Sequence, residues 1–202
     1  EFLDGLLRYG SIMTTIENNL QAMRARIAAA CQDAGRDVSQ VQLLAVSKTF
    51  PAASVQQALD AGQRDFGENY IQEAVAKIGE LAGMPAVWHC IGPIQGNKTR
   101  LVAEHFDWAQ SVDRLKIAQR LSDQRPAHLA PLQVCIQVNT DGGPTKAGVT
   151  PEALPELARA ISRLPRLRLR GLMTIPEPAA DFTSAFALHA RARALFDALN
   201  AQ

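Results

Sequence analysis

The stretch Leu43-Leu44-Ala45-Val46-Ser47-Lys48-Thr49 determines how the rest of the chain can be arranged. Its apolar run is too short to form a helix by itself and stands before Pro51, which is typical of a buried strand in a parallel sheet. One lysine, Lys48, follows the run at its carboxyl end. In an α/β barrel the loops at that end of the strands build the functional site. Lys48 is therefore the first candidate functional residue.

The chemistry of Lys48 has two interpretations. An ammonium in the mouth of a barrel loses part of its hydration, which favours the neutral and nucleophilic amine. Such an amine forms Schiff bases with carbonyl compounds. In the alternative interpretation, the side chain only extends from the end of a strand into water. This stretch alone leaves both interpretations open.

Composition excludes several classes of protein. With 202 residues, of which 47% are hydrophobic and 20% charged, the chain is expected to form one globular domain with a substantial core. A net charge of +1 gives no general attraction for nucleic acids or anionic membranes. No apolar run is long enough to cross a bilayer. The cysteines Cys31, Cys90 and Cys135 are odd in number and far apart, which favours free thiols in the cytoplasm over disulfides or a zinc site.

Strand and helix patterns alternate six times along the chain. Short apolar or alternating runs predict strands at residues 41–46, 64–66, 86–91, 108–112, 132–138 and 167–174. Helical spacing and capping residues predict helices at residues 14–35, 51–62, 71–83, 99–104, 113–121, 150–164 and 182–199. Short connections of this kind are typical of right-handed parallel units.

The expected fold class is α/β, a (β/α)8 TIM-barrel-like parallel sheet with an extra N-terminal helix. A closed barrel needs eight units, and the sequence supplies six. We expect the last two β/α units to be missing, because an open parallel sheet would leave apolar edge strands uncovered. Residues 1–12, before Met13, are expected to be a leader or an expression remnant, and residues 13–202 a single, C-terminally incomplete barrel domain.

Polar and reactive side chains follow each of the six predicted strands. Because the carboxyl ends of barrel strands converge on one mouth, we expect these side chains to meet there. In strand order they are Lys48; Glu68 and Asn69; His89, Gln95, Asn97 and Lys98; Ser111 and Asp113; Asn139 and Lys146; and Met173 and Thr174.

Five motifs along the chain resemble those of a known family. They are Ala45-Val46-Ser47-Lys48-Thr49, Phe66-Gly67-Glu68-Asn69-Tyr70-x-Gln72-Glu73, Trp88-His89-x-Ile91-Gly92-x-x-Gln95-x-Asn97-Lys98, Gln137-Val138-Asn139 and Arg170-Gly171-Leu172-Met173. In this order and spacing they are similar to the YggS/PROSC family of pyridoxal phosphate homeostasis proteins. That family is similar in fold to the barrel domain of alanine racemase. The resemblance covers residues 13–202.

The resemblance implies a cofactor and a set of residues around it. Lys48 would hold pyridoxal 5′-phosphate as a Schiff base, with Asn69, His89 and Met173 around the cofactor. More distant positions around the same site would be Ser47, Glu68, Gln95, Asn97, Lys98, Asn139 and Lys146. No residue is assigned a catalytic or metal-binding role.

Several of these residues have a structural alternative. His89 is equally well explained as a core histidine that is hydrogen-bonded to a neighbouring strand. Asn97 fits the cap of the helix that follows it. Glu68 fits an ion pair with a basic neighbour such as Lys98.

The sequence departs from the family pattern at two places. Gly142-Gly143-Pro144-Thr145 precede Lys146 where the family carries an acidic, serine-containing stretch. In the family, the cofactor phosphate is held by a Ser- and Gly-containing turn after strand seven and by an Arg-x-Gly-Thr segment on strand eight. Neither segment is among the 202 residues, so a fragment of this length is expected to bind the cofactor weakly or not at all and to be of low stability.

Two functions of different class remain. The first is a carrier that holds pyridoxal phosphate without substrate turnover and passes it to apo-enzymes, acting as a monomer in the cytoplasm. The second is an amino-acid racemase or a Schiff-base lyase, and a more remote third is an aldolase-type enzyme. Racemisation needs two groups facing a planar intermediate, and the only tyrosines are Tyr9 and Tyr70, which favours the carrier. The arginines at 163, 166, 168 and 170 have no interleaved aromatic residues, which disfavours RNA binding.

Overall fold

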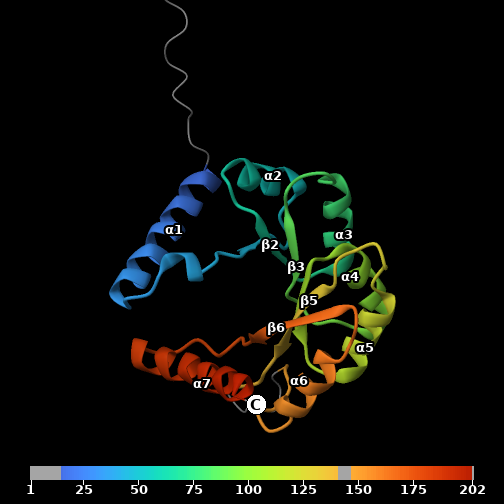
Figure 1. Ribbon diagram of the computed structural model, residues 1–202. Helices are drawn as coiled ribbons and strands as arrows, with labels where there is room; N and C mark the ends of the chain where they lie inside the picture. The colour runs from blue at the N-terminus through green and yellow to red at the C-terminus, as the bar shows by residue number, and fades with distance from the viewer. Residues whose placement is uncertain (1–14, 141–146, 202) are drawn as a thin grey trace, which may run out of the picture.

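The computed structural model describes residues 15–140 and 147–201, and its helices and strands alternate along the chain as the sequence predicts (Figure 1). The strands are β1 (Ala45–Val46), β2 (Asp65–Glu68), β3 (Val87–Cys90), β4 (Trp108–Val112), β5 (Leu132–Gln137) and β6 (Leu167–Met173). The helices are α1 (Thr15–Asp33), α2 (Ala52–Asp60), α3 (Ile71–Glu80), α4 (Thr99–His105), α5 (Leu115–Gln124), α6 (Leu154–Ser162) and α7 (Phe182–Asn200), with short 3-10 turns at Val38–Gln40 and Gly96–Lys98.

The six strands form one parallel sheet in the order β1-β2-β3-β4-β5-β6. Sequential order and parallel pairing confirm the predicted α/β class, since each strand pairs with the next one after a helical crossover. Within the described residues, β1 and β6 are the outer strands, and no ladder joins them. Figure 1 shows α2 to α6 along one side of the curved sheet, with α1 and α7 at its two ends.

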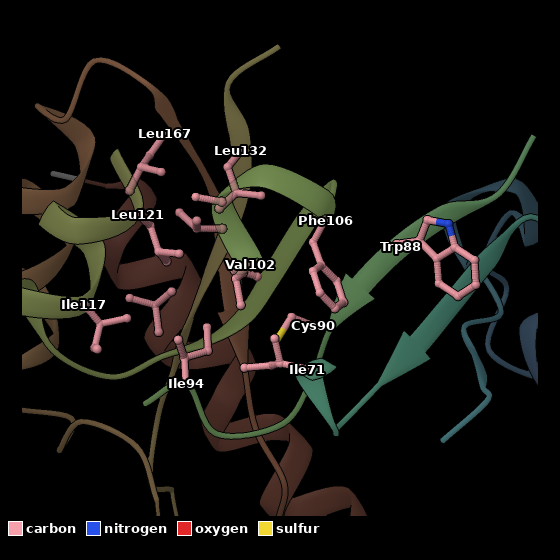
Figure 2. Close-up of a cluster of buried hydrophobic side chains, with 14 of the residues drawn as sticks. Ile71, Trp88, Cys90, Ile94, Val102, Phe106, Ile117, Leu121, Leu132 and Leu167 are labelled. Atoms are coloured by element: carbon pink, nitrogen blue, oxygen red, sulfur yellow. The ribbon is translucent and has the colours of Figure 1, made fainter. Parts of the chain in front are cut away.

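The main core lies between the sheet and helices α2 to α6 (Figure 2). Alternate residues of β5, namely Leu132, Val134 and Ile136, are completely buried. Phe66, Cys90 and Ala109 extend this core across β2, β3 and β4, and Val102 and Phe106 meet it from α4 and its end. Successive side chains of a strand point to opposite faces, so the residues between these positions lie on the other face of the sheet. We call that other face, which carries Asp65, His89 and Gln110, the inner face.

The first strand is shorter than its sequence predicts. Residues 41–44 lie outside β1, and pairing with β2 begins only at Ala45, opposite Phe66. The side-chain amide of Gln63 donates to the carbonyl oxygens of Leu43 (2.7 Å) and Asp65 (2.9 Å). The Leu43 carbonyl therefore bonds to a side-chain amide, where the prediction expected backbone hydrogen bonds between strands.

One predicted helix start is wrong and another is displaced. Asp113 does not cap α5, because both of its carboxylate oxygens accept from the guanidinium of Arg114, at 2.8 and 3.0 Å, and the helix begins at Leu115. The helix expected from Thr150 begins at Leu154, but Thr150 does make the contacts of a capping residue. Its hydroxyl accepts from Ala153 N–H at 3.4 Å, and its carbonyl oxygen accepts from Leu154 N–H at 3.2 Å.

Some predictions fall outside the described residues, namely the leader at 1–12, the helix start at residue 14 and Lys146. The division into a leader and a single domain stays a prediction. None of the helices in the described ranges combines the length and the apolar character needed to cross a bilayer. Over the same ranges, no group of three or more metal-binding side chains is found.

Candidate functional site

Lys48 lies at the carboxyl end of β1, in a turn that runs from Ser47 to Phe50. Phe50 N–H donates to the Ser47 carbonyl at 3.1 Å and closes this turn. The side chain of Lys48 is exposed, so the loss of hydration expected from the sequence is not found. Among the described residues, its amine has no hydrogen-bond or ion-pair partner. Ser47 points toward Lys77 of α3, and the side chain of Lys48 extends in another direction.

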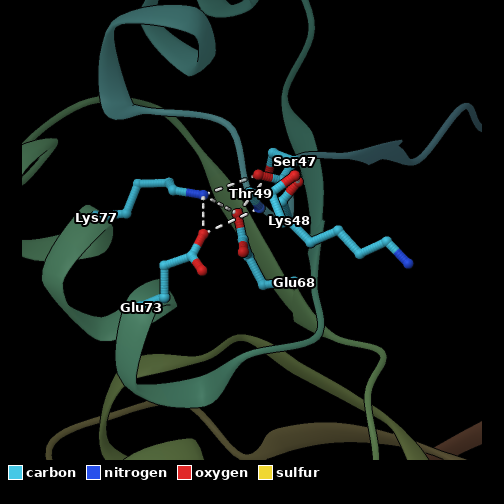
Figure 3. A network of polar contacts seen from close by, with 6 residues as sticks. All are labelled: Ser47, Lys48, Thr49, Glu68, Glu73 and Lys77. Atoms are coloured by element: carbon cyan, nitrogen blue, oxygen red, sulfur yellow. Dashed lines mark hydrogen bonds and ion pairs between the residues drawn. The ribbon is translucent and has the colours of Figure 1, made fainter.

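A buried polar network lies directly behind this turn (Figure 3). The Lys77 ammonium donates to Glu68 Oε1 at 2.6 Å and to the Ser47 carbonyl at 2.8 Å, and it lies 3.6 Å from Glu73 Oε1. The Ser47 hydroxyl donates to the same Glu68 oxygen at 2.6 Å. Glu68 is completely buried and Lys77 is 4% exposed. Figure 3 shows the Lys48 side chain extending away from this network.

The alternative that Glu68 pairs with a basic neighbour is confirmed. Glu68 does form an ion pair, but with Lys77 of α3 and not with Lys98. Lys77 was missed because lysines on helices are usually solvated. A signal was present: Lys77 stands on the apolar face of α3, between the buried Ala74 and the packed Ile78, where a charge requires a partner.

His89 is hydrogen-bonded on both sides across the inner face of the sheet. Its Nε2 lies 3.0 Å from Asp65 Oδ1 on β2, and the amide nitrogen of Gln110 on β4 lies 2.9 Å from its Nδ1. An amide N–H can only donate, so Nδ1 accepts and Nε2–H donates to Asp65, which makes the ring neutral. The ring also stacks on Trp108, with centroids 5.2 Å apart. The interpretation of His89 as a core histidine is confirmed, and its contact with a cofactor stays a prediction.

The environment of His89 predicts a pH-dependent stability. Burial lowers the pKa of His89 below its ordinary value of 6.5, against the opposing effect of the Asp65 and Asp107 carboxylates. As the pH falls through about 6.5, the unfolded chain takes up a proton that the folded ring resists, so stability present above that pH is lost below it. Urea unfolding at about pH 7.5 and about pH 5.5 should show this loss, and it should shrink in His89→Gln. An NMR titration of the ring with a midpoint above 6.5 would contradict the prediction.

The ends of β2 and β3 bring three predicted site residues together. Asn69, Gln95 and Lys98 line one depression of about 450 Å³, together with Tyr70, Glu73 and Pro93. Asn69 lies against Gly92, where a β-carbon would come 2.5 Å from the Asn69 carbonyl oxygen. The alternative that Asn97 caps the following helix is wrong: α4 follows Lys98 and has no side-chain cap.

Met173 is the last residue of β6, and Asn139 follows the end of β5. The Met173 carbonyl accepts from Val138 N–H at 2.9 Å, and Asn139 N–H donates to the Val149 carbonyl at 3.0 Å. In the described sheet, four strands separate the strand of Met173 from that of Lys48. The structure therefore groups Asn69, Gln95 and Lys98 and places Ser47 and Glu68 behind Lys48, whereas Met173 and Asn139 belong to β6 and to the segment after β5.

Comparison with known proteins gives consistent matches. Residues 18–202 match the family described as the alanine racemase N-terminal domain. A pyridoxal phosphate homeostasis protein of Pseudomonas aeruginosa is 61% identical over 188 residues, which cover 93% of this chain and 82% of that protein. The protein of the same name from Escherichia coli K12 is 53% identical over 177 residues, covering 86% and 76%.

Solved structures agree with the fold. PipY of Synechococcus elongatus PCC7942, solved without PLP, superposes with a TM-score of 0.81 at 38% identity, covering 93% of this chain and 83% of PipY. PipY with PLP bound superposes with a TM-score of 0.77 at 36% identity, covering 93% of this chain and 82% of PipY. Alanine racemase of Corynebacterium glutamicum superposes with a TM-score of 0.64 at 15% identity, covering 92% of this chain and 50% of the racemase. This is a likeness of fold alone.

Proposed function

Because the chain belongs to the alanine racemase N-terminal domain family, and within it to the pyridoxal phosphate homeostasis proteins, we propose that it holds pyridoxal phosphate as a Schiff base on Lys48 without substrate turnover. The membership confirms the resemblance that the five sequence motifs indicated. The related PipY protein has been solved with PLP bound, which supports the same cofactor for this chain.

One observation carries the proposal. Lys48 is an exposed amine at the carboxyl end of a parallel strand, and the described residues offer it no partner. In its neutral form, such an amine is free to react with an aldehyde. It adds to the aldehyde carbon, a C=N bond replaces the C=O bond, and one water molecule leaves.

The other predicted residues fit such a ligand to different degrees. Asn69 and Lys98 offer polar groups at the same edge of the sheet, where an anionic ligand would lie. Both ring nitrogens of His89 already have hydrogen-bond partners, and Trp108 stacks on the ring. His89 would therefore contribute by packing on the inner face and not by a new hydrogen bond to the ligand. Met173, the last residue of β6, is proposed to lie beside the cofactor.

The proposal of a carrier, and not a racemase or lyase, rests on what faces the lysine. Within the described ranges the only tyrosine is Tyr70, which stands at the start of α3 with 56% of its surface exposed. A racemase needs a second positioned acid or base across a planar intermediate. We expect no incorporation of solvent deuterium at the α-carbon of an added amino acid, measured by NMR; exchange at enzymatic rates would support the racemase instead.

The proposed setting is the cytoplasm, with apo-enzymes that use pyridoxal phosphate as recipients and the monomer as the working form. The three cysteines are free, and Cys31 and Cys90 are buried. Burial raises the pKa of the Cys90 thiol to about 12 and that of Cys135 to about 11, so both remain unreactive thiols suited to a reducing compartment.

Reductive trapping tests the proposal. Adding pyridoxal phosphate and then borohydride should attach a reduced label to Lys48, located by mass spectrometry of peptides, because hydride fixes the C=N bond as a secondary amine. Lys48→Arg keeps the charge and removes the nucleophile, so it should lose the label at this position. Lys116, which is exposed on α5, measures the background labelling of surface lysines. Labelling of Lys48 no faster than that of Lys116 would overturn the proposal.

A further inference from the structure

The turn that carries Lys48 has an unfavourable backbone conformation. Thr49 has φ of 67°, the one positive φ of a non-glycine residue in the described ranges. With Phe50 N–H bonded to the Ser47 carbonyl, a positive φ at the third residue only is the pattern of a type II turn. That position favours glycine or asparagine, and a β-branched threonine there is strained. Strain of this kind persists only where the surroundings hold it in place.

The surroundings hold the residues on both sides of Lys48. On one side, the Ser47 carbonyl accepts from Lys77 at 2.8 Å and the Ser47 hydroxyl donates to Glu68 at 2.6 Å. On the other side, Thr49 N–H donates to Glu73 Oε1 at 3.0 Å. Lys77 connects the two sides, since it contacts both glutamates. Lys48 itself takes no part in the network (Figure 3).

From this arrangement we propose that Glu68, Glu73 and Lys77 are positioning residues that fix the backbone of Lys48 and so direct its amine into the site on the inner face. The proposal rests on the function proposed above. It extends that function by assigning a role to Glu68 on β2 and to Glu73 and Lys77 on α3, from which the Lys48 side chain extends away.

The physical reason is preorganisation. A lysine side chain has many conformations, and a mobile backbone beneath it would add more that must be lost when the amine bonds to the aldehyde. The buried contacts of Lys77 fix the backbone before that step: its ammonium has three donors and faces three acceptors, which are Ser47 O, Glu68 Oε1 and Glu73 Oε1. The cost of ordering the turn is thus met during folding.

Glu73 allows a test that leaves the buried pair intact. Its side chain is 42% exposed in the first turn of α3, so Glu73→Ala should fold. The loss of its acceptor should speed hydrogen exchange of the Thr49 amide by about tenfold and lower the equilibrium constant for the Lys48 adduct with pyridoxal phosphate by about three- to tenfold. Glu73→Gln keeps an acceptor oxygen and should restore both quantities. Glu80→Ala removes an exposed charge from the end of the same helix and should change neither.

The outcomes separate this inference from the proposed function. If wild-type protein forms the adduct on Lys48 and Glu73→Ala forms it with the same equilibrium constant, the positioning role is overturned and the proposed function stands. Unchanged exchange of the Thr49 amide would overturn it as well, and so would failure of Glu73→Gln to restore the adduct. No adduct on wild-type Lys48 would overturn both proposals. A purely structural role for Glu73 would lower the midpoint of unfolding without changing the adduct.

Discussion

Replacing Lys77 with methionine should lower the free energy of unfolding by about 3–5 kcal/mol. Methionine nearly matches the lysine side chain in length, so little space is left empty, and the main effect is electrostatic. Glu68 is completely buried, and its Oε2 already lacks a hydrogen-bond partner among the described residues. Without Lys77, the carboxylate keeps only the Ser47 hydroxyl, which cannot neutralise a buried charge. Urea unfolding followed by circular dichroism, with an unchanged slope, measures the loss.

Two companion variants identify the cause. Adding Glu68→Gln to Lys77→Met removes the uncompensated charge and should recover more than half of the lost stability, because the ion pair is coupled. Lys116→Met changes a lysine that is exposed on α5 and should cost no more than about 0.5 kcal/mol. If Lys77→Met cost less than about 1 kcal/mol, the pair would be unimportant and the account of the network would be wrong.

The order of the elements could be predicted from the sequence because each depends on local periodicity. The alternation of Leu132, Val134 and Ile136 marks β5 without any knowledge of its neighbours, and all three are buried. Gly62 and Gly83 mark helix ends, and both have the positive φ that such ends require. The exact start of α5 could not be predicted, because Asp113 had two available partners and bound Arg114 in place of the helix end.

The site was predictable to the extent that strand ends are predictable. Lys48 and Asn69 stand just after the ends of β1 and β2, and Lys98 ends the 3-10 turn in the loop after β3. Contacts between elements were not predictable in this way. Lys77 lies 30 residues from Ser47, and no local pattern connects the two. The same limit explains why Lys77 could not be identified from the sequence as the partner of Glu68, and why Lys48 is more exposed to solvent than expected.

Substituting alanine for Gly92 should lower the free energy of unfolding by about 3 kcal/mol, because the added methyl group has no space. A β-carbon at this position would lie 2.5 Å from the Asn69 carbonyl oxygen and 2.8 Å from its α-carbon, and these are backbone atoms that cannot rotate away. The Gly92 carbonyl also accepts from the Ser111 hydroxyl, so a shift of Gly92 disturbs β4 as well. Since Asn69 is proposed to lie beside the cofactor, the variant should also weaken the Lys48 adduct.

Gly79→Ala is the matched control, since it makes the same chemical change at an exposed position of α3. A β-carbon at Gly79 meets nothing within 4 Å, and the residue lies in the last turn of α3. Alanine has a higher helix propensity than glycine, so this variant should gain about 0.5–1 kcal/mol. Changes in stability of opposite sign in the two variants, measured by urea unfolding, would show that the close approach of Gly92 to Asn69 shapes this edge of the site. A Gly92→Ala protein as stable as wild type would show instead that the ends of β2 and β3 can move apart freely, and Asn69 would then be too loosely held to orient a ligand.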